Sequence, residues 1–526
     1  MHRRAVLASL AVFLAALGST ARADNPPGCP LQAVTREAIE AALPKLRTYA
    51  NEAIATTGVP GIAIAIVWKD QVVALESFGV REAGKPEPVN ADTVFQLASV
   101  SKPIASTVVA ALIGECLLRW DDPVSKYDPD FALSDRYVTR NVTFADLMSH
   151  RSGLPDHGGD ELEDNGFSRD QIQPRLRQLR LYPFRGQFFY TNHGFTAAAV
   201  AAAKAYGRSW EETSAEVLYL PLGMTSTSSR YSDFIHAANR ASTHIWENGG
   251  WVAKYRRQPD AQSPAGGVSS SARDMAQWMK LLVGHGSFGG QQVVDKNALD
   301  ASHRPLLVNG PAATADQRSG FYGIGWGVSI DDMARVRWTH SGAFGLGAST
   351  NVTILPADEL GITVLVNTQP VGVPEAMVET LLDILQFGDR RQDWVPYFRQ
   401  LFLAMVPPPV APPANPLPPR ENAAYVGTYT NTYFGDIQIT EQGGHLALTI
   451  GPDHATFPLD HFNGDTFAYY PPVERADGAS GVITNLGGAP AAKAPVRFEV
   501  KSGHRHASVV HLENYDEVGL GTFHRR

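Results

Sequence analysis

The stretch Phe95-Gln-Leu-Ala-Ser-Val-Ser-Lys-Pro-Ile-Ala-Ser106 organises the rest of the chain. If it opens a helix, Ser99 and Lys102 lie on one helical face, which brings the hydroxyl within reach of the amine. A serine becomes nucleophilic at neutral pH when a base lies beside it, and a lysine can be that base only if burial or a neighbouring charge lowers its pKa. The flanking residues are mostly apolar, which favours burial. Pro103 fits only the first turn of a helix, so we expect Ser99 near the helix N-terminus.

Two distant triplets carry side chains that suit the same chemistry. Tyr190-Thr-Asn192 precedes a helix of small residues predicted over 196–204. A phenol beside the Ser-Lys pair can pass protons, and Asn192 can hold a substrate amide or the lysine by hydrogen bonds. His340-Ser-Gly342 follows a strand predicted over 335–338. There Gly342 would let a substrate backbone lie against the strand edge. His340 can donate to a substrate carbonyl or carboxylate, or help keep the lysine and the phenol in useful protonation states.

Other polar clusters are interpreted as structural. We expect His150, Arg151 and Ser152, which precede Gly-Leu-Pro155, to stabilise a buried turn. The C-terminal histidines lack acidic or cysteine partners at ligand spacing, so no metal site is predicted. These histidines are His504, His506 and His511.

The length of 526 residues predicts two or three domains. A hairpin is expected over 61–68 and 72–78, and strands resume at 323–329, 334–338, 348–354 and 360–367, with mostly helical patterns between. The fold class is therefore α/β (α+β): a sheet flanked by helices with a helical lobe. A proline-rich segment reads as a stiff linker over 399–420, and short strands after it predict a small all-β barrel over 421–526.

The first residues have the pattern of an export signal. Arg3 and Arg4 precede an apolar run and Ala21-Arg-Ala23, so we expect a signal peptide over 1–23 and a hydrolase region over 24–398. This predicts a periplasmic or secreted protein, and the run is too short to span a membrane. The other residues of a twin-arginine signal are absent. The sequence leaves open whether Cys29 and Cys116 form a disulfide.

Read in order, Ser99-Val-Ser-Lys102, Tyr190-Thr-Asn192 and His340-Ser-Gly342 resemble the class C β-lactamase and penicillin-binding-protein family of serine hydrolases. The resemblance covers roughly residues 30–390. It implies an antiparallel sheet of the β-lactamase/transpeptidase type and an acyl-enzyme on Ser99, with Lys102 and Tyr190 as the general-base pair. It also implies an oxyanion hole from the backbone N–H groups of Ser99 and Ala343. The substrate-binding residues that the resemblance implies are Asn192, His340, Ser341, Gly342 and Ala343.

One departure from the family pattern guides the choice of substrate. Members that hold a β-lactam or D-Ala carboxylate usually have lysine where this chain has His340. A neutral imidazole holds an anion less well than an ammonium. Histidine there, together with a C-terminal barrel that resembles the lipocalin-like barrels appended to some members, is more similar to the esterases, peptidases and D-aminopeptidases of the family.

The sequence therefore predicts an exported, cofactor-free serine hydrolase of small esters, amides or short peptides. One alternative is a true β-lactamase or DD-carboxypeptidase. An alternative of another class is a sensor module that is acylated or binds peptides without turnover. The net charge of −8 offers no basic surface for nucleic acid. The barrel could mediate a homo-oligomer, and the sequence leaves open which of Lys102 and Tyr190 takes the first proton.

Overall fold

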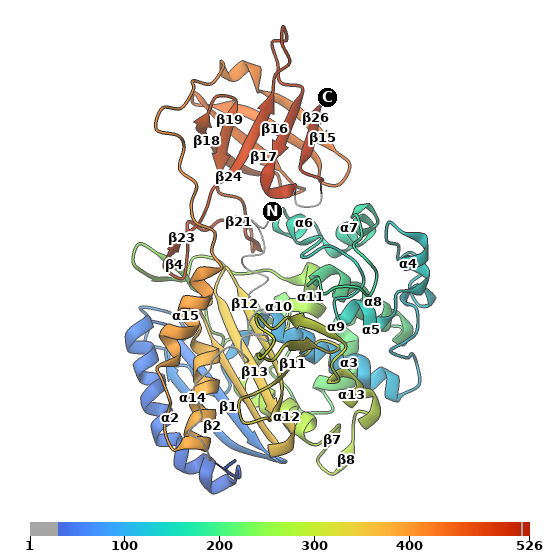
Figure 1. The fold of residues 1–526 in the computed structure, drawn as a ribbon, viewed down its shortest axis with the longest axis vertical. Helices are drawn as coiled ribbons and strands as arrows, with labels where there is room; N and C mark the ends of the chain where they lie inside the picture. The colour runs from blue at the N-terminus through green and yellow to red at the C-terminus, as the bar shows by residue number, and fades with distance from the viewer. Residues whose placement is uncertain (1–29, 517–518) are drawn as a thin grey trace.

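An eight-stranded antiparallel sheet forms the centre of the first domain in this computed structural model, which describes residues 30–516 and 519–526 (Figure 1). The strand order is β2-β1-β14-β13-β12-β11-β10-β9, so strands from both ends of the region meet in one sheet, as the sequence predicts. The strands are β1 Gly61–Trp68, β2 Gln71–Gly79, β9 Leu307–Gly310, β10 Gly320–Tyr322, β11 Gly327–Ile330, β12 Val336–Phe344, β13 Ala348–Leu355 and β14 Leu360–Val366.

The sequence of β1 explains why helices cover both faces of this sheet. Successive side chains of a strand point to opposite faces. Ile62, Ile64 and Ile66 pack into one apolar cluster with α2 Arg36–Thr57, α14 Val373–Phe387 and α15 Trp394–Ala404, whereas Ala63, Ala65 and Val67 pack into the cluster of the helical lobe. An apolar residue at nearly every position is stable only when both faces are buried.

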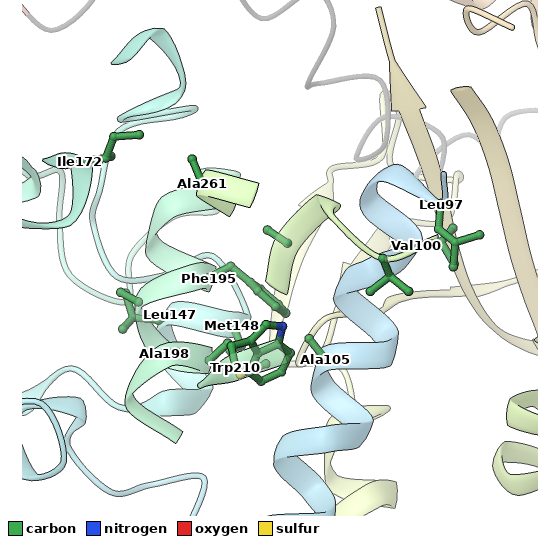
Figure 2. Packing of buried hydrophobic residues seen from close by; sticks show 14 of the residues in the cluster. Leu97, Val100, Ala105, Leu147, Met148, Ile172, Phe195, Ala198, Trp210 and Ala261 are labelled. Carbon is green, nitrogen blue, oxygen red and sulfur yellow. The ribbon is translucent and has the colours of Figure 1, made fainter. Parts of the chain in front are cut away.

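The helical lobe is built around α3 Ser101–Gly114, which begins two residues after Ser99 and holds Pro103 in its first turn, as predicted. Ser101 to Leu112 are all buried. Figure 2 shows Trp210 and Met148 in the space between α3, which carries Ala105, and the helix that carries Ala198. The other helices of this domain are α4 Arg136–Asn141, α5 Phe144–Met148, α6 Asp160–Asp164, α7 Arg169–Ile172, α8 Asn192–Tyr206, α9 Trp210–Ser214, α10 Tyr231–His236, α11 Ser263–Gly266, α12 Ala272–Val283 and α13 Lys296–Ser302.

The C-terminal region folds into a closed eight-stranded barrel above the first domain (Figure 1). Buried aliphatic and aromatic side chains from all around the barrel form its core. The predicted small all-β barrel is therefore confirmed. Its strands are β15 Gly427–Asn431, β16 Gly435–Gln442, β17 His445–Ile450, β18 Ala455–Asn463, β19 Thr466–Tyr469, β24 Ala494–Glu499, β25 Val509–Leu512 and β26 Thr522–Arg525.

Three expectations about boundaries are corrected. Residues 323–326 form a turn between β10 and β11 rather than a strand. His340 lies within β12, because that strand continues to Phe344 by pairing with β13. The linker predicted from residue 399 begins later, since α15 runs to Ala404 and buries Phe398 and Phe402 in the apolar cluster beside the sheet.

The predicted signal peptide and Cys29 lie outside the described residues, so the export signal and the disulfide remain untested predictions. Cys116 is exposed. Among the helices of residues 30–516 and 519–526, none combines the length and apolar character needed to cross a lipid bilayer. The same residues contain no cluster of three potential metal ligands.

Candidate active site

The Lys102 amine lies beside the Ser99 hydroxyl, at a distance of 3.1 Å from Nζ to Oγ. Nζ also donates to Asn192 Oδ1 at 2.7 Å and to the carbonyl oxygen of Ala265 at 3.0 Å. A neutral amine has two hydrogens and one lone pair. The oxygens of Asn192 and Ala265 can only accept hydrogen bonds, so they take the two hydrogens of the amine. The lone pair of the amine is then directed at the Ser99 O–H. The arrangement suits removal of the serine proton.

Asp160 fixes the orientation of the Asn192 amide. Asn192 Nδ2 donates to Asp160 Oδ2 at 2.8 Å, and a carboxylate can only accept, so the amide oxygen must face Lys102. His157 Nδ1 lies 2.9 Å from the same carboxylate oxygen. Burial lowers the pKa of His157, but Asp156 and Asp160 together outweigh it and raise the pKa to about 9. Asp160 is thus held as a carboxylate by a cationic histidine.

Burial separates the protonation states of the lysine and the phenol. It lowers the pKa of Lys102 well below its usual value, against the opposing charge of Asp160. It raises the pKa of Tyr190, which the Ser99 hydroxyl lowers to a smaller extent. Lys102 Nζ lies 4.4 Å from the centre of the Tyr190 ring. Burial therefore favours a neutral amine and a protonated phenol on the two sides of Ser99.

The backbone around Ser99 is strained and tightly enclosed. Ala98 has a φ of 48°, in the left-handed region that costs a non-glycine residue about 1–2 kcal/mol. A methyl group added at Gly342 would collide with the Leu97 carbonyl oxygen and the Thr350 hydroxyl and would lie 3.1 Å from the Ser99 nitrogen. Only glycine at 342 lets β12 approach the nucleophile turn this closely.

We expect Gly342→Ala to lower the free energy of unfolding by about 1–3 kcal/mol, because the extra methyl group overpacks a buried contact between two backbones. Thermal unfolding followed by circular dichroism measures the change. Gly250→Ala is the matched control, since a methyl group there meets no atom within 4 Å. Equal melting temperatures for the two variants would show that β12 and the Ser99 turn are not in tight contact.

In the part of the chain that the structure describes, β12 has an unpaired edge beyond Thr339, in the segment where Gly342 packs against the Ser99 turn. β11 pairs with β12 only over residues 336–339, whereas β13 pairs with it as far as Phe344. Among the described residues, no strand covers the free edge from His340 to Phe344. The backbone of Gly342 and Ala343 could therefore pair with an extended substrate along this edge. Ala343, for which an oxyanion role is predicted, lies in this unpaired segment.

Both ring nitrogens of His340 are engaged within the protein. Nδ1 lies 2.7 Å from the carbonyl oxygen of Ser341, so it must carry the proton and donate. Nε2 then accepts from the Tyr322 hydroxyl at 2.9 Å. Burial, together with the charge of Lys102, lowers the pKa of His340 to about 3. This neutral tautomer has no free N–H, so the predicted donation from His340 to a substrate, which stays a prediction, would require Nδ1 to leave the Ser341 carbonyl oxygen.

The Ser341 side chain points away from Ser99. Its hydroxyl donates to Glu375 on α14 at 2.7 Å and accepts from Asn351 at 3.0 Å. Alternation along β12 explains this, since Gly342 faces the nucleophile turn and its neighbour must face the opposite side. The Ser341 hydroxyl is therefore not directed at Ser99, and the substrate contact predicted for Ser341 stays a prediction.

The roles of several residues of the site are not indicated by local sequence patterns. Ala265 lies in the glycine turn Pro264-Ala-Gly-Gly267, and the sequence did not indicate that its carbonyl oxygen accepts from Lys102. Asp160 begins an acidic run that is typical of an exposed helix. His150 lies in the buried turn that was expected, yet it also accepts from the Thr191 N–H at 3.1 Å and its ring lies 4.4 Å from that of Tyr190.

Known proteins resemble the chain over both domains. Residues 45–385 match the family model described as Beta-lactamase, and residues 411–515 match one described as a domain of unknown function, DUF3471. Beta-lactamase-like protein 2 of Dictyostelium discoideum is 26% identical and covers 80% of this chain and 75% of its own length. Penicillin-binding protein 4 of Amycolatopsis lactamdurans is 27% identical and covers 70% of this chain and 93% of its own length.

A solved structure shares the whole two-domain fold. The octameric penicillin-binding protein homologue from Pyrococcus abyssi superposes with a TM-score of 0.58 at 20% identity, covering 91% of this chain and 99% of its own. At this identity the likeness concerns the fold alone.

Proposed function

Because the chain belongs to the beta-lactamase family of serine hydrolases, we propose that it hydrolyses small esters, amides or short peptides through an acyl-enzyme on Ser99. The contact of Lys102 Nζ with Ser99 Oγ, together with its two carbonyl-type acceptors, carries this proposal. The neutral lysine takes the hydroxyl proton, and Oγ attacks the substrate carbonyl carbon. The backbone N–H groups of Ser99 and Ala343 hold the oxyanion.

Proton return completes the reaction. In this proposal Lys102 takes the first proton because burial favours its neutral form, whereas Tyr190 keeps its proton and can pass it to the leaving group. A water molecule then attacks the acyl carbon and gives a proton to the Tyr190 phenolate, while the protonated Lys102 returns its proton to Ser99 Oγ as the bond from Oγ to the acyl carbon breaks. No cofactor is needed for these steps.

Trapping the covalent intermediate tests this proposal. The purified protein is treated with a fluorophosphonate or a slowly released p-nitrophenyl ester, and intact mass and peptide mapping locate the adduct. We expect one adduct, on Ser99, and release of many equivalents of p-nitrophenol per protein. An adduct on another residue would overturn the nucleophile, and labelling of Ser99 without turnover would favour the sensor alternative.

The neutral state of His340 predicts a preference for substrates without a free carboxylate near the scissile bond. We expect the wild-type protein to hydrolyse a neutral ester faster than its matched carboxylate-bearing analogue. A charged donor would stabilise the bound carboxylate by about 1.5–3 kcal/mol, and neutral His340 does not provide one. His340→Lys should shift the ratio of the two kcat/KM values by about tenfold toward the anion. His340→Gln is the neutral control, and nitrocefin tests the β-lactamase alternative. Faster hydrolysis of the anionic substrate by the wild-type protein would contradict the preference.

We also propose that the protein is exported to the periplasm or secreted and that it forms homo-oligomers through the barrel. The N-terminal sequence supports export, and the octameric state of the Pyrococcus abyssi homologue supports assembly. Sedimentation of the full chain tests assembly, and N-terminal sequencing of the protein from its producing cells tests removal of residues 1–23.

A further inference from the structure

An arm from the C-terminal barrel docks on the first domain. Residues 473–490, called the arm here, lie between β19 and β24 and form two short hairpins (Figure 1). The hairpins are β20 Glu474–Ala476 with β21 Ala479–Gly481, and β22 Asn485–Leu486 with β23 Ala489–Pro490. The Leu346 side chain of the first domain is buried in a small apolar cluster with Ile483 and Leu486 of the arm.

Glu474 of the arm binds the turn that ends β12. Its carboxylate accepts the backbone N–H of Gly345 at 2.8 Å and that of Leu346 at 3.0 Å. Glu474 is 9% exposed, and burial raises the pKa of its carboxyl to about 7, although Arg257 and the two N–H groups oppose this shift. The ionised form binds the two donors more strongly than a neutral acid does. The two donors follow directly after Ala343 and Phe344. The barrel therefore fixes the backbone next to the proposed oxyanion donor.

A buried arginine extends this contact to the other side of the site. Arg257 is 1% exposed, and its Nε lies 3.5 Å from Glu474 Oε2. Its Nη2 lies 2.9 Å from Glu163 Oε1, on the same short helix α6 that begins with Asp160. The guanidinium also lies 4.9 Å from the centre of the Phe344 ring. One charge cluster thus joins the arm, the end of β12 and the helix that orients Asn192.

We propose that Glu474 is a positioning residue that holds the end of β12 so that the Ala343 N–H meets the oxyanion formed on Ser99. The C-terminal barrel thereby completes the active site of the first domain. This inference rests on the proposed function. Apolar contacts of Leu346 and the hydrogen bond from the Tyr255 hydroxyl to the Val482 carbonyl hold the arm independently of the charge. Replacing the carboxylate should therefore loosen the turn without releasing the arm.

The test compares Glu474→Gln with wild type in the full chain. Glutamine keeps the size of the side chain but offers one acceptor oxygen in place of two. We expect kcat for a p-nitrophenyl ester to fall by about 10-fold to 100-fold with little change in KM, because an oxyanion donor acts in the transition state. The ratio of ester to thionoester hydrolysis should fall as well, since sulfur depends less on that donor. A merely structural role would leave this ratio unchanged.

Asp477→Asn is the matched control in the arm, because the Asp477 carboxylate is exposed and pairs with Arg256, at 3.6 Å, rather than with the turn that ends β12. It should leave kcat and the ratio unchanged. Glu474→Asp retains the charge next to Arg257 but shortens the reach to the turn, so it should remain folded and show a smaller fall in both quantities. Unchanged kcat and ratio in both Glu474 variants, with Ser99 still labelled by a fluorophosphonate, would overturn the inference. Failure of wild-type Ser99 to be labelled would instead overturn the proposed function.

Discussion

Replacing Ser99 with alanine is expected to reduce hydrolysis of p-nitrophenyl esters by roughly 10⁴-fold or more, the scale on which loss of a serine nucleophile acts. We expect the variant to keep the short turn over Ala98–Val100 and the helix after it, because the Ser99 hydroxyl interacts with the side chains of Lys102 and Tyr190 rather than with the backbone of the turn. Initial rates with several esters, together with labelling by a fluorophosphonate, measure the loss. Circular dichroism establishes that the fold is retained.

Ser502→Ala is the control for adventitious serine reactivity. Ser502 is exposed and belongs to Lys501-Ser-Gly503, a triplet in the barrel region that ends in Ser-Gly, as His340-Ser-Gly342 does. We expect full activity in this variant. If Ser99→Ala retained ester turnover, the acyl-enzyme would have to form elsewhere, and the contact between Ser99 and Lys102 would have no catalytic meaning.

The architecture was largely predictable because its signals are local. The apolar run of β1 and the turn after it specify the hairpin with β2, and Pro103 fixes the start of α3. The strands around the barrel show short apolar alternation between turns. The helix α15 was missed although Trp394, Phe398 and Phe402 recur with helical spacing, because the prolines that follow dominate the composition of that stretch.

The site was predictable only where a side chain acts within a short motif. The spacing of Ser99 and Lys102 determines their contact, so the sequence suffices for this pair. By contrast, the state of His340 depends on Tyr322, which reaches it from another strand of the sheet. Glu474 lies in another domain, and nothing in its local sequence indicates that it binds the end of β12. Such contacts join residues that are far apart in the sequence, so no local pattern or periodicity in the sequence indicates them.

Replacing Lys102 with methionine is expected to lower kcat/KM by about 10²–10⁴-fold, the usual contribution of a general base. Methionine fills a similar volume in this buried position, so the fold should persist, but it offers Ser99 no basic nitrogen. In the wild-type protein, activity should rise with pH as the lysine loses its proton, with a midpoint well below the ordinary lysine value, because burial lowers this pKa. A pH profile of kcat/KM for wild type and variant measures both effects.

Lys102→Arg separates the basic function from the positive charge. A guanidinium stays protonated at every working pH and cannot accept the Ser99 proton, so this variant should be as inactive as Lys102→Met. Lys69→Met, at an exposed lysine on the turn between β1 and β2, should retain full activity. If Lys102→Arg retained the activity of the wild type, the lysine would act only through its charge, and Tyr190 would have to take the first proton. The rising limb of the pH profile would then lie near the raised pKa of the phenol, far above the range that a buried amine gives.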